Sequence, residues 1–304
     1  MKAVRVNEWG APVQYEDIPR PEPADDEVLV KVHAASVNPV DSVIQAGFME
    51  GWVHAPLTLG ADFAGEVVAV GRDVSHVKPG DAVYGQSPAF GTFAEYVAVK
   101  GNGVAHKPKS LDDASAAAAG LTGMVAWQSL YNLAQLEAGE RVLIHGAGGG
   151  VGLLATQLAR LRGAVVITHD KRDKEALLRS LGADEFMAVE DLPFEEVCGN
   201  VDVVLDLVPM GIYEDRSYLV CGPGARYVTP TGQPSQEKAG QKGVAAIGMF
   251  AQPTVADLDG LAAAIDAGSV KVFVNRTFPL AQAAAAMAYR QQGGKVGKVV
   301  LAVE

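Results

Sequence analysis

Short apolar or alternating runs, separated by turn residues, fill residues 1 to about 110 of the chain. The runs are EVLVKVHAASV, GEVVAVG, DAVYG and FAEYVAV, and the segments between runs include RPEPADD, VKPGD and KGNG. Proline, glycine and aspartate are typical of turns rather than of helix interiors. The close spacing of the runs predicts an all-β, barrel-like unit in this part of the chain.

From SLDDASAAAAGL onward, helical spacing alternates with apolar strands. The predicted strands are RVLIHG, AVVITH, DEFMAV, VDVVLDLV, ARYVTP and VAAIGM, and segments such as KRDKEALLRSLGA have helical spacing. Strands that recur about every 20 residues with helices between them predict a parallel, doubly wound sheet.

The last segment, GSVKVFVNRTFPLAQAAAAMAYRQQGGKVGKVVLAVE, predicts a strand, an alanine-rich helix and a closing strand. We expect it to return to the first domain. The predicted division is a β-barrel domain over residues 1–115 and 268–304 and a Rossmann-type domain over residues 116–267.

The glycine-rich stretch HGAGGGVG, residues 145–152, lies between the strand RVLIHG and a predicted helix. A G-x-x-G-x-x-G frame fits through Gly146, Gly149 and Gly152, although the commoner G-x-G-x-x-G frame does not. Glycines in this setting allow a sharp turn, a close approach of the backbone to a pyrophosphate, and close packing of the helix on the sheet. Backbone N–H groups at the start of the helix would then bind phosphate oxygens. The stretch therefore predicts a dinucleotide site.

The residues after the second Rossmann strand leave the choice of dinucleotide open. Asp170 favours NAD because an acid at this position binds ribose hydroxyls. Lys171, Arg172 and Lys174 favour NADP because a basic cluster can accept the 2′-phosphate. A solvated charged helix start would also account for the run.

Composition narrows the class of protein. The 304 residues suffice for about two domains, and 49% hydrophobic with 20% charged residues is typical of a soluble globular protein. A net charge of -11 disfavours a nucleic acid as the main partner. No apolar run approaches the roughly 18 residues of a membrane span. Because the N-terminus also lacks the apolar core of a signal peptide, we expect a cytoplasmic protein without a membrane segment.

Several motifs along nearly the whole chain resemble the zinc-independent quinone oxidoreductase (zeta-crystallin-like) branch of the medium-chain dehydrogenase/reductase family. They are ASVNPVDSVIQAG (35–47), PLTLGADFAGEVVAVG (56–71), VKPGDAVYG (77–85), GTFAEYVAV (91–99), HGAGGGVG (145–152), SLGAD (180–184) and GKVVL (297–301). The resemblance implies a GroES-like β-barrel catalytic domain and a Rossmann domain with a doubly wound parallel sheet.

The resemblance bears first on the metal. Zinc-dependent relatives carry a Cys near the position of Ser36 and a His at the position of Ala61, and they have a later four-cysteine lobe that this chain lacks. Cys198 and Cys221 are the only cysteines and are expected to be small core residues. The prediction is therefore that no metal is bound. Asp62 keeps the family's acid in G-x-D-x-x-G and is expected to be structural.

Without a metal, the family implies hydride transfer from NADPH to a quinone or an α,β-unsaturated carbonyl. Asn38 matches the family's asparagine near the nicotinamide and the substrate oxygen, and its amide could donate to an oxygen on which charge develops. Alternatively, Asn38 fixes its own loop and Asp41 caps the following helix. The tyrosines that some relatives have nearby are replaced by Val43 and Met49, so we expect water to supply the proton.

Gap-free counting from the family motifs assigns further positions. It places His169 at the acidic ribose-binding position and Lys174 at a lysine that resembles a 2′-phosphate ligand, which favours NADP. Val125 stands where many relatives have a nicotinamide-side threonine, and Thr122, one turn earlier, is a substitute. The full set expected to contact the cofactor is Asn38, Asp41, Thr122, Gly146, Ala147, Gly149, Gly150, Val151, Gly152, Thr168, His169, Lys171, Arg172 and Lys174.

Three functions follow, in order of preference. The first is a zinc-independent, NADPH-dependent oxidoreductase that acts on a quinone or enone and has Asn38 as its catalytic residue. The second is a non-catalytic member of the family, either crystallin-like or RNA-binding, although the negative net charge of the chain disfavours RNA binding. The third is an alcohol dehydrogenase with an altered metal site. The family is commonly dimeric, so we expect a homodimer with a small-molecule substrate.

Overall fold

The computed structural model describes the whole chain, Met1 to Glu304. It divides into two compact units. The first unit comprises Met1–Met124, Gln252–Gly268 and Val272–Glu304, and the second comprises Val125–Ala251 and Ser269–Lys271.

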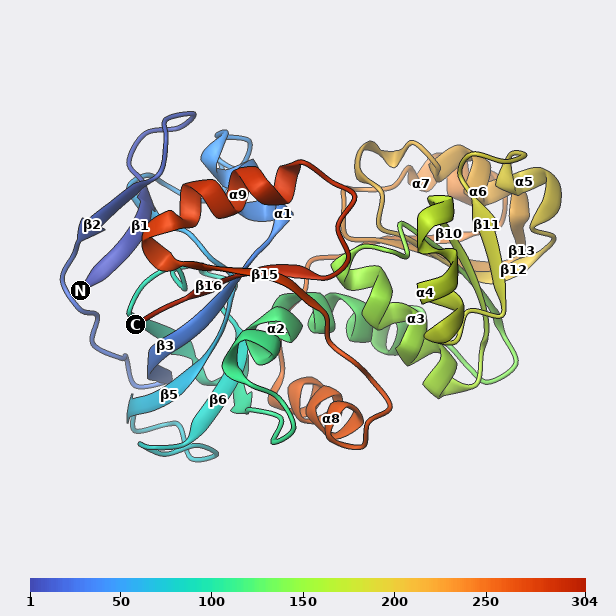
Figure 1. Cartoon of the computed structure of the whole chain (residues 1–304). Coiled ribbons are helices and arrows are strands. Elements are labelled where there is room, and N and C mark those ends of the chain that lie inside the picture. The colour runs from blue at the N-terminus through green and yellow to red at the C-terminus, as the bar shows by residue number, and fades with distance from the viewer. The chain divides into compact units, whose positions relative to one another are not determined.

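A seven-stranded sheet and a three-stranded sheet build the first unit (Figure 1). The larger sheet has the order β15-β16-β3-β5-β6-β8, and β7 pairs with β3. Its strands are β3 (Glu27–Val37), β5 (Asp62–Val70), β6 (Ala82–Gln86), β7 (Tyr96–Lys100), β8 (Val104–His106), β15 (Val274–Pro279) and β16 (Lys298–Ala302). The smaller sheet contains β1 (Lys2–Val6), β2 (Gln14–Asp17) and β4 (Leu57–Thr58).

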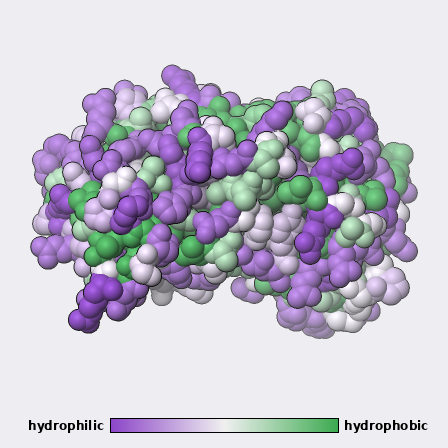
Figure 2. Space-filling model, turned by 90° about the horizontal axis from the view of Figure 1, so that it is seen from below, coloured by the Kyte–Doolittle hydropathy of each residue, from purple (hydrophilic) through white to green (hydrophobic).

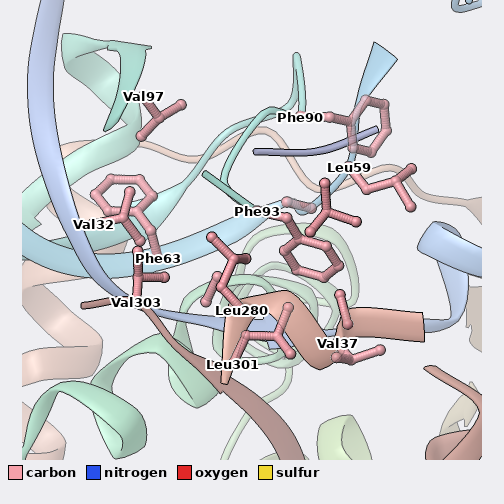
Figure 3. Close-up of a cluster of buried hydrophobic side chains, with 14 of the residues drawn as sticks. Val32, Val37, Leu59, Phe63, Phe90, Phe93, Val97, Leu280, Leu301 and Val303 are labelled. Atoms are coloured by element: carbon pink, nitrogen blue, oxygen red, sulfur yellow. The ribbon is translucent and has the colours of Figure 1, made fainter. Parts of the chain in front are cut away.

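Four helices lie wholly or mostly in the first unit. They are α1 (Pro39–Gln45), α2 (Asp113–Trp127), α8 (Val255–Asp266) and α9 (Ala283–Gln291). Between α9 and the seven-stranded sheet, aromatic and aliphatic side chains form the core. Figure 3 shows Phe63, Phe93, Leu280 and Leu301 of this core, each 5% exposed or less. Strand β16 pairs with β3, so the end of the chain lies in the same sheet as the N-terminal strands.

The second unit is a six-stranded parallel sheet of order β11-β10-β9-β12-β13-β14. Its strands are β9 (Arg141–His145), β10 (Val165–Asp170), β11 (Glu185–Ala188), β12 (Val201–Asp206), β13 (Cys221–Thr229) and β14 (Ala245–Gly248). Its helices are α3 (Gly150–Arg162), α4 (Glu175–Ser180), α5 (Phe194–Val197), α6 (Glu214–Val220) and α7 (Gln236–Gln241), and they lie on both faces of the sheet (Figure 1). The strand order reverses between β9 and β12, which makes that point the topological switch of a doubly wound fold.

Every strand predicted for the Rossmann domain is present, so the fold class is confirmed. The limits of the units differ from the predicted 115/116 and 267/268 boundaries. Much of α2 and all of α8 belong to the first unit. Tyr84 of β6 donates its hydroxyl hydrogen to the carbonyl of Leu258 in α8 at 2.6 Å, and Leu261 packs so closely on Gly123 that a Cβ there would lie 2.2 Å from it. Through these contacts α8 packs on β6 and on α2 in the first unit, although the sequence pattern assigned α8 to the Rossmann domain.

Hydrophilic residues cover most of the face drawn in Figure 2, and hydrophobic residues form small separate groups there. None of the helices is both long and apolar enough to span a membrane.

Candidate functional site

The glycine turn, residues Gly146 to Gly150, connects β9 to α3 at the switch point of the parallel sheet. Gly146 has a φ of +72°, a conformation that L side chains rarely adopt, so this position requires glycine. The N–H of Gly146 donates to the carbonyl of His169 at 3.0 Å, and the N–H of Gly149 donates to the carbonyl of Gly146 at 3.1 Å. The turn is therefore fixed to the end of β10 before α3 begins.

An added side chain would meet different neighbours at each glycine of this stretch. A Cβ on Gly152 would lie 2.5 Å from Cα of Ala147, so Gly152 allows α3 to pack on the turn. A Cβ on Gly148 would lie 2.8 Å from Cγ of Lys174. A Cβ on Gly149 would meet only the Gly146 carbonyl, at 3.3 Å, and Gly149 has an ordinary extended conformation. A side chain at position 149 would therefore require only a small shift of this one carbonyl, whereas a ligand that approaches the backbone would require glycine.

The end of β10 presents an acid to this turn. Asp170 Oδ2 accepts the N–H of Gly148 at 2.7 Å, and Asp170 Oδ1 accepts the N–H of Lys171 at 2.7 Å. Sequence reasoning treated Asp170 only as a possible ribose ligand and missed this bond to the glycine turn. The geometry shows that both oxygens of Asp170 already accept backbone hydrogen bonds.

The basic run after β10 lies among carboxylates. Lys171 is exposed, whereas Arg172 forms ion pairs with Asp191 and Glu175. Lys174 is 6% exposed and its Nζ lies 3.0 Å from Asp173 Oδ2, while its aliphatic stem covers Gly148. The structure thus brings one predicted phosphate ligand, Lys174, directly onto the glycine turn.

Two other predicted cofactor residues point into the protein instead. Thr168 is fully buried, and its hydroxyl donates to the carbonyl of Glu185 at 3.2 Å. His169 is 4% exposed, and its Nδ1 lies 2.9 Å from Nδ1 of His145. Both belong to an inner strand of a sheet covered on its two faces, where successive side chains are buried. His169 was predicted at the ribose-binding position from its distance along the chain to the family motifs. That distance does not show in which direction the side chain points.

The two histidines form a buried pair. Since each ring nitrogen is a donor or an acceptor, one Nδ1 donates to the other. His145 Nε2 lies 3.0 Å from Ser217 Oγ, and the ring of His145 stacks on that of Tyr213. Burial lowers the pKa of His145 well below its ordinary value and lowers that of His169 to about 4. Both rings are therefore neutral at pH 7. The sequence contained His145 as the first residue of the glycine stretch but gave no sign of this pairing.

Thr122 and Asn38 both belong to the first unit. The hydroxyl of Thr122 donates to the carbonyl of Ala118 within α2 at 2.6 Å, and the residue is 4% exposed. Asn38 is 1% exposed, and its amide donates to the Ser36 carbonyl at 2.9 Å and to Asp62 Oδ2 at 3.0 Å. Asn38 therefore fixes its own loop, as one of the two sequence interpretations expected.

Asp41 was expected both to contact the cofactor and to cap the helix. In the structure Asn38 is the N-cap of α1 and Asp41 is the third residue of the helix. Asp41 Oδ2 accepts the N–H of Asn38 at 2.7 Å, and Oδ1 accepts the N–H of Gly60 at 3.2 Å. Burial raises the pKa of Asp41 to about 7. With no exposed surface and both oxygens occupied, Asp41 supports the loop, and we leave it out of the proposed cofactor contacts.

Asp62 and Lys298 complete this buried cluster. Besides the Asn38 amide, Asp62 accepts the N–H and the hydroxyl of Ser36, each at 2.8 Å. Burial raises the pKa of Asp62, while Lys298 and these hydrogen bonds act in the opposite direction. Lys298 Nζ donates to the carbonyl of Val37 at 3.0 Å and to Oδ1 of Asn38. The GKVVL motif contains this lysine, but nothing in the motif indicates its contact with Asn38.

The positions of the zinc ligands in zinc-dependent relatives carry no suitable donors here. Ala61 has no ligating atom, and the Ser36 hydroxyl donates to Asp62. The structure contains no group of three or more His, Cys, Asp or Glu side chains placed to hold a metal ion. These residues do not fit a zinc centre of the family type.

Parts of both units match the sequence models of known protein families. Residues 24–109 match the alcohol dehydrogenase GroES-like domain, and residues 181–301 match a model described as zinc-binding dehydrogenase. The chain is 32% identical to human quinone oxidoreductase over 99% of its own length and 97% of the relative's length. The chain belongs to the quinone oxidoreductase branch of the medium-chain dehydrogenase/reductase family.

Other members of this branch and family agree with that assignment. The structure of the quinone oxidoreductase from Coxiella burnetii superposes with a TM-score of 0.89 at 32% identity and covers 100% of this chain and 99% of that chain. Human NAD(P)H oxidoreductase RTN4IP1, mitochondrial, is 34% identical over 91% of this chain and 82% of its own length. This member of the branch is therefore an oxidoreductase, with a GroES-like unit and a Rossmann unit.

Proposed function

We propose that the protein is a zinc-independent, NADPH-dependent reductase that transfers hydride to a quinone or an α,β-unsaturated carbonyl compound. The observation that carries this proposal is the glycine turn. It lies at the switch point of the parallel sheet, and Gly149 leaves its backbone uncovered there. Dinucleotides bind at this place in doubly wound folds. The names of the human relatives, quinone oxidoreductase and NAD(P)H oxidoreductase, support the same assignment.

The residues of the second unit fit a dinucleotide. The first turn of α3 offers backbone N–H groups without intrahelical partners, and these would hold the pyrophosphate together with Gly149 and Gly150. Lys174 lies over the turn, and Lys171 is exposed beside it. We assign the 2′-phosphate to these two lysines, which is the basis of the proposed NADPH preference. Asp170 accepts one backbone N–H on each oxygen and keeps a further lone pair on each for a ribose hydroxyl, so the proposed preference for NADPH rests on the two lysines.

When bound, the reduced nicotinamide supplies the hydride, and the protein's part is to orient the reactants and polarise the acceptor. In our proposal the amide of Asn38 donates to the acceptor oxygen on which negative charge develops. To do so it exchanges its bond to the Ser36 carbonyl and keeps its bond to Asp62. Water supplies the proton because Val43 and Met49 replace the family's nearby tyrosines.

A single assay tests the reaction. NADPH oxidation is followed against a panel of quinones and enones, before and after exhaustive chelation, with NADH as a parallel cofactor. We expect turnover with conjugated acceptors that survives chelation, and no oxidation of simple saturated alcohols with NADP⁺. Stoichiometric zinc whose removal stops turnover would favour an alcohol dehydrogenase. NADPH binding without turnover on any acceptor would favour a non-catalytic protein. Light scattering on the same sample tests the expected homodimer.

A further inference from the structure

Lys298 is a buried lysine in the first unit, with 8% of its surface exposed. Lysine is rarely buried this far unless it is paired. It is the first residue of β16, and the next residue, Val299, is paired with Val37 at the end of β3. This register places Lys298 beside Asn38, which follows β3 directly.

The contacts of Lys298 determine how the Asn38 amide is turned. An ammonium group has only donors, so the side-chain atom of Asn38 that faces it must be the oxygen Oδ1. The amide nitrogen Nδ2 must then face the opposite way, where the Ser36 carbonyl and the Asp62 carboxylate are both acceptors. A flipped amide would place N–H groups against the ammonium and an oxygen against a carboxylate. Lys298 and Asp62 together therefore allow one orientation.

We propose that Lys298 is a positioning residue, which orients the Asn38 amide and polarises it so that its N–H groups are stronger donors to the oxygen of the acceptor. A hydrogen bond from a cation to the amide oxygen draws electron density from the nitrogen and strengthens its donation. The inference rests on the donor role of Asn38 in the proposed function.

The charges around Lys298 make the effect dependent on pH. Asp62 of β5 and Asp41 of α1 face it with negative charge, and Arg290 of α9 faces it with positive charge. Burial lowers the pKa of Lys298 to about 8, against the attraction of the two carboxylates. As pH rises through this value, the ammonium becomes a neutral amine. The amide oxygen of Asn38 then loses its charged donor.

The first test observes the amide itself. In full-length protein labelled with ¹⁵N-asparagine, the Asn38 side-chain signals are assigned by their absence in Asn38→Asp. We expect these signals to shift with a midpoint near pH 8 from Lys298, in addition to any step near pH 7 from Asp41, which accepts the backbone N–H of Asn38. In Lys298→Arg the step near pH 8 should be absent, because arginine remains charged, and only the step from Asp41 should remain. Signals that do not move in the wild type, or that move equally in Lys298→Arg, would overturn the inference. Neither outcome depends on enzymatic turnover.

The second test measures the consequence for turnover with a quinone that the wild type reduces. We expect wild-type kcat to fall by about tenfold between pH 7 and 9.5, the size of one weakened charge-assisted hydrogen bond, with little change in the KM for NADPH. Lys298→Arg should keep its kcat to pH 9.5, and Lys298→Met should be low and flat across this range. Lys238→Met, which removes an exposed lysine paired with Asp215, should behave as the wild type does.

The two tests separate the inference from the proposed function. If no acceptor is reduced, the proposed function fails, and the spectroscopic test still decides whether Lys298 governs the amide. If turnover is found and Lys298→Arg loses it at high pH as the wild type does, the positioning role is wrong. If Lys298→Met does not fold, both tests can still be made by comparing the wild type with Lys298→Arg across the pH range.

Discussion

Asp170 Oδ2 accepts a hydrogen bond from the backbone N–H of Gly148 at 2.7 Å, so an acid at the end of β10 holds the middle of the glycine turn. The bond crosses between two segments 22 residues apart in the sequence. It fixes the orientation of the Asp170 carboxylate, while the stem of Lys174 lies over the same glycine. The proposed preference for NADPH therefore depends on which basic side chains near this bond can reach a phosphate.

Three alanine variants test this choice. We expect Lys174→Ala and Lys171→Ala to raise the KM for NADPH by about tenfold or more and to leave the KM for NADH nearly unchanged, because each loses a charge-assisted contact to the 2′-phosphate. Arg172→Ala should have a smaller effect, since this guanidinium pairs with both Asp191 and Glu175, whereas Lys174, although paired with Asp173, lies against Gly148 of the glycine turn. Equal losses for both cofactors in steady-state kinetics would contradict the assignment of the 2′-phosphate to these lysines.

The glycines of the turn separate cofactor binding from folding. We expect Gly149→Val to abolish NADPH binding, measured by calorimetric titration, while the protein stays folded, because the one atom outside its chain neighbours within 4 Å of a Cβ there is the Gly146 carbonyl oxygen, at 3.3 Å. Gly152→Ala is the matched comparison. Its Cβ would lie 2.5 Å from Ala147, so it should lower the free energy of unfolding by about 1 to 3 kcal/mol. Unchanged NADPH affinity in Gly149→Val would argue against a pyrophosphate at this backbone.

Asn38 is expected to act on turnover more than on cofactor binding. Asn38→Ala should lower kcat by about 10-fold to 1,000-fold, as the loss of a single oxyanion donor does, with a much smaller change in the dissociation constant for NADPH. Because Asn38 also holds its loop, circular dichroism and urea unfolding must accompany the kinetics. A variant that is folded and retains wild-type kcat would leave Asn38 with its loop-fixing role alone.

The buried pair His145 and His169 predicts an acid-sensitive second unit. The pKa of His169 is about 4 in the folded protein against an ordinary 6.5, since burial disfavours the charged ring. Between these values the unfolded chain binds the proton more readily, so the free energy of unfolding should fall as pH falls from 6.5 to 4, by about 2 kcal/mol or more. Above pH 6.5 the pair should contribute no pH dependence.

Urea unfolding between pH 4.5 and 7.5 measures this slope. His169→Gln should flatten it, and His54→Gln, which alters an exposed histidine, should leave it as in the wild type. An identical slope in all three proteins would show that other groups cause the acid sensitivity.

Local patterns in the sequence were enough to predict the helices, the strands and the glycine turn. The alternation of apolar strands with helical segments specifies a parallel sheet, and the glycines specify where its backbone turns, since both signals are local. The fold class and the family followed from these patterns and motifs. The predicted roles of Gly146 and Gly152 also need only their own neighbours, and the structure shows the conformation and contact expected of them.

Which side chains contact one another depends on how the strands pair, and local patterns do not specify that pairing. Lys298 lies beside Asn38, 260 residues away, because β16 pairs with β3 in one register, and no local signal carries that register. His169 turns inward to His145, and Asp170 turns to Gly148, because adjacent residues of a strand point to opposite sides and the neighbouring strand supplies their partners. The spacing of the motifs along the chain indicated which positions lie near the proposed cofactor site. The pairing between strands determined which atoms at those positions remain available to a ligand.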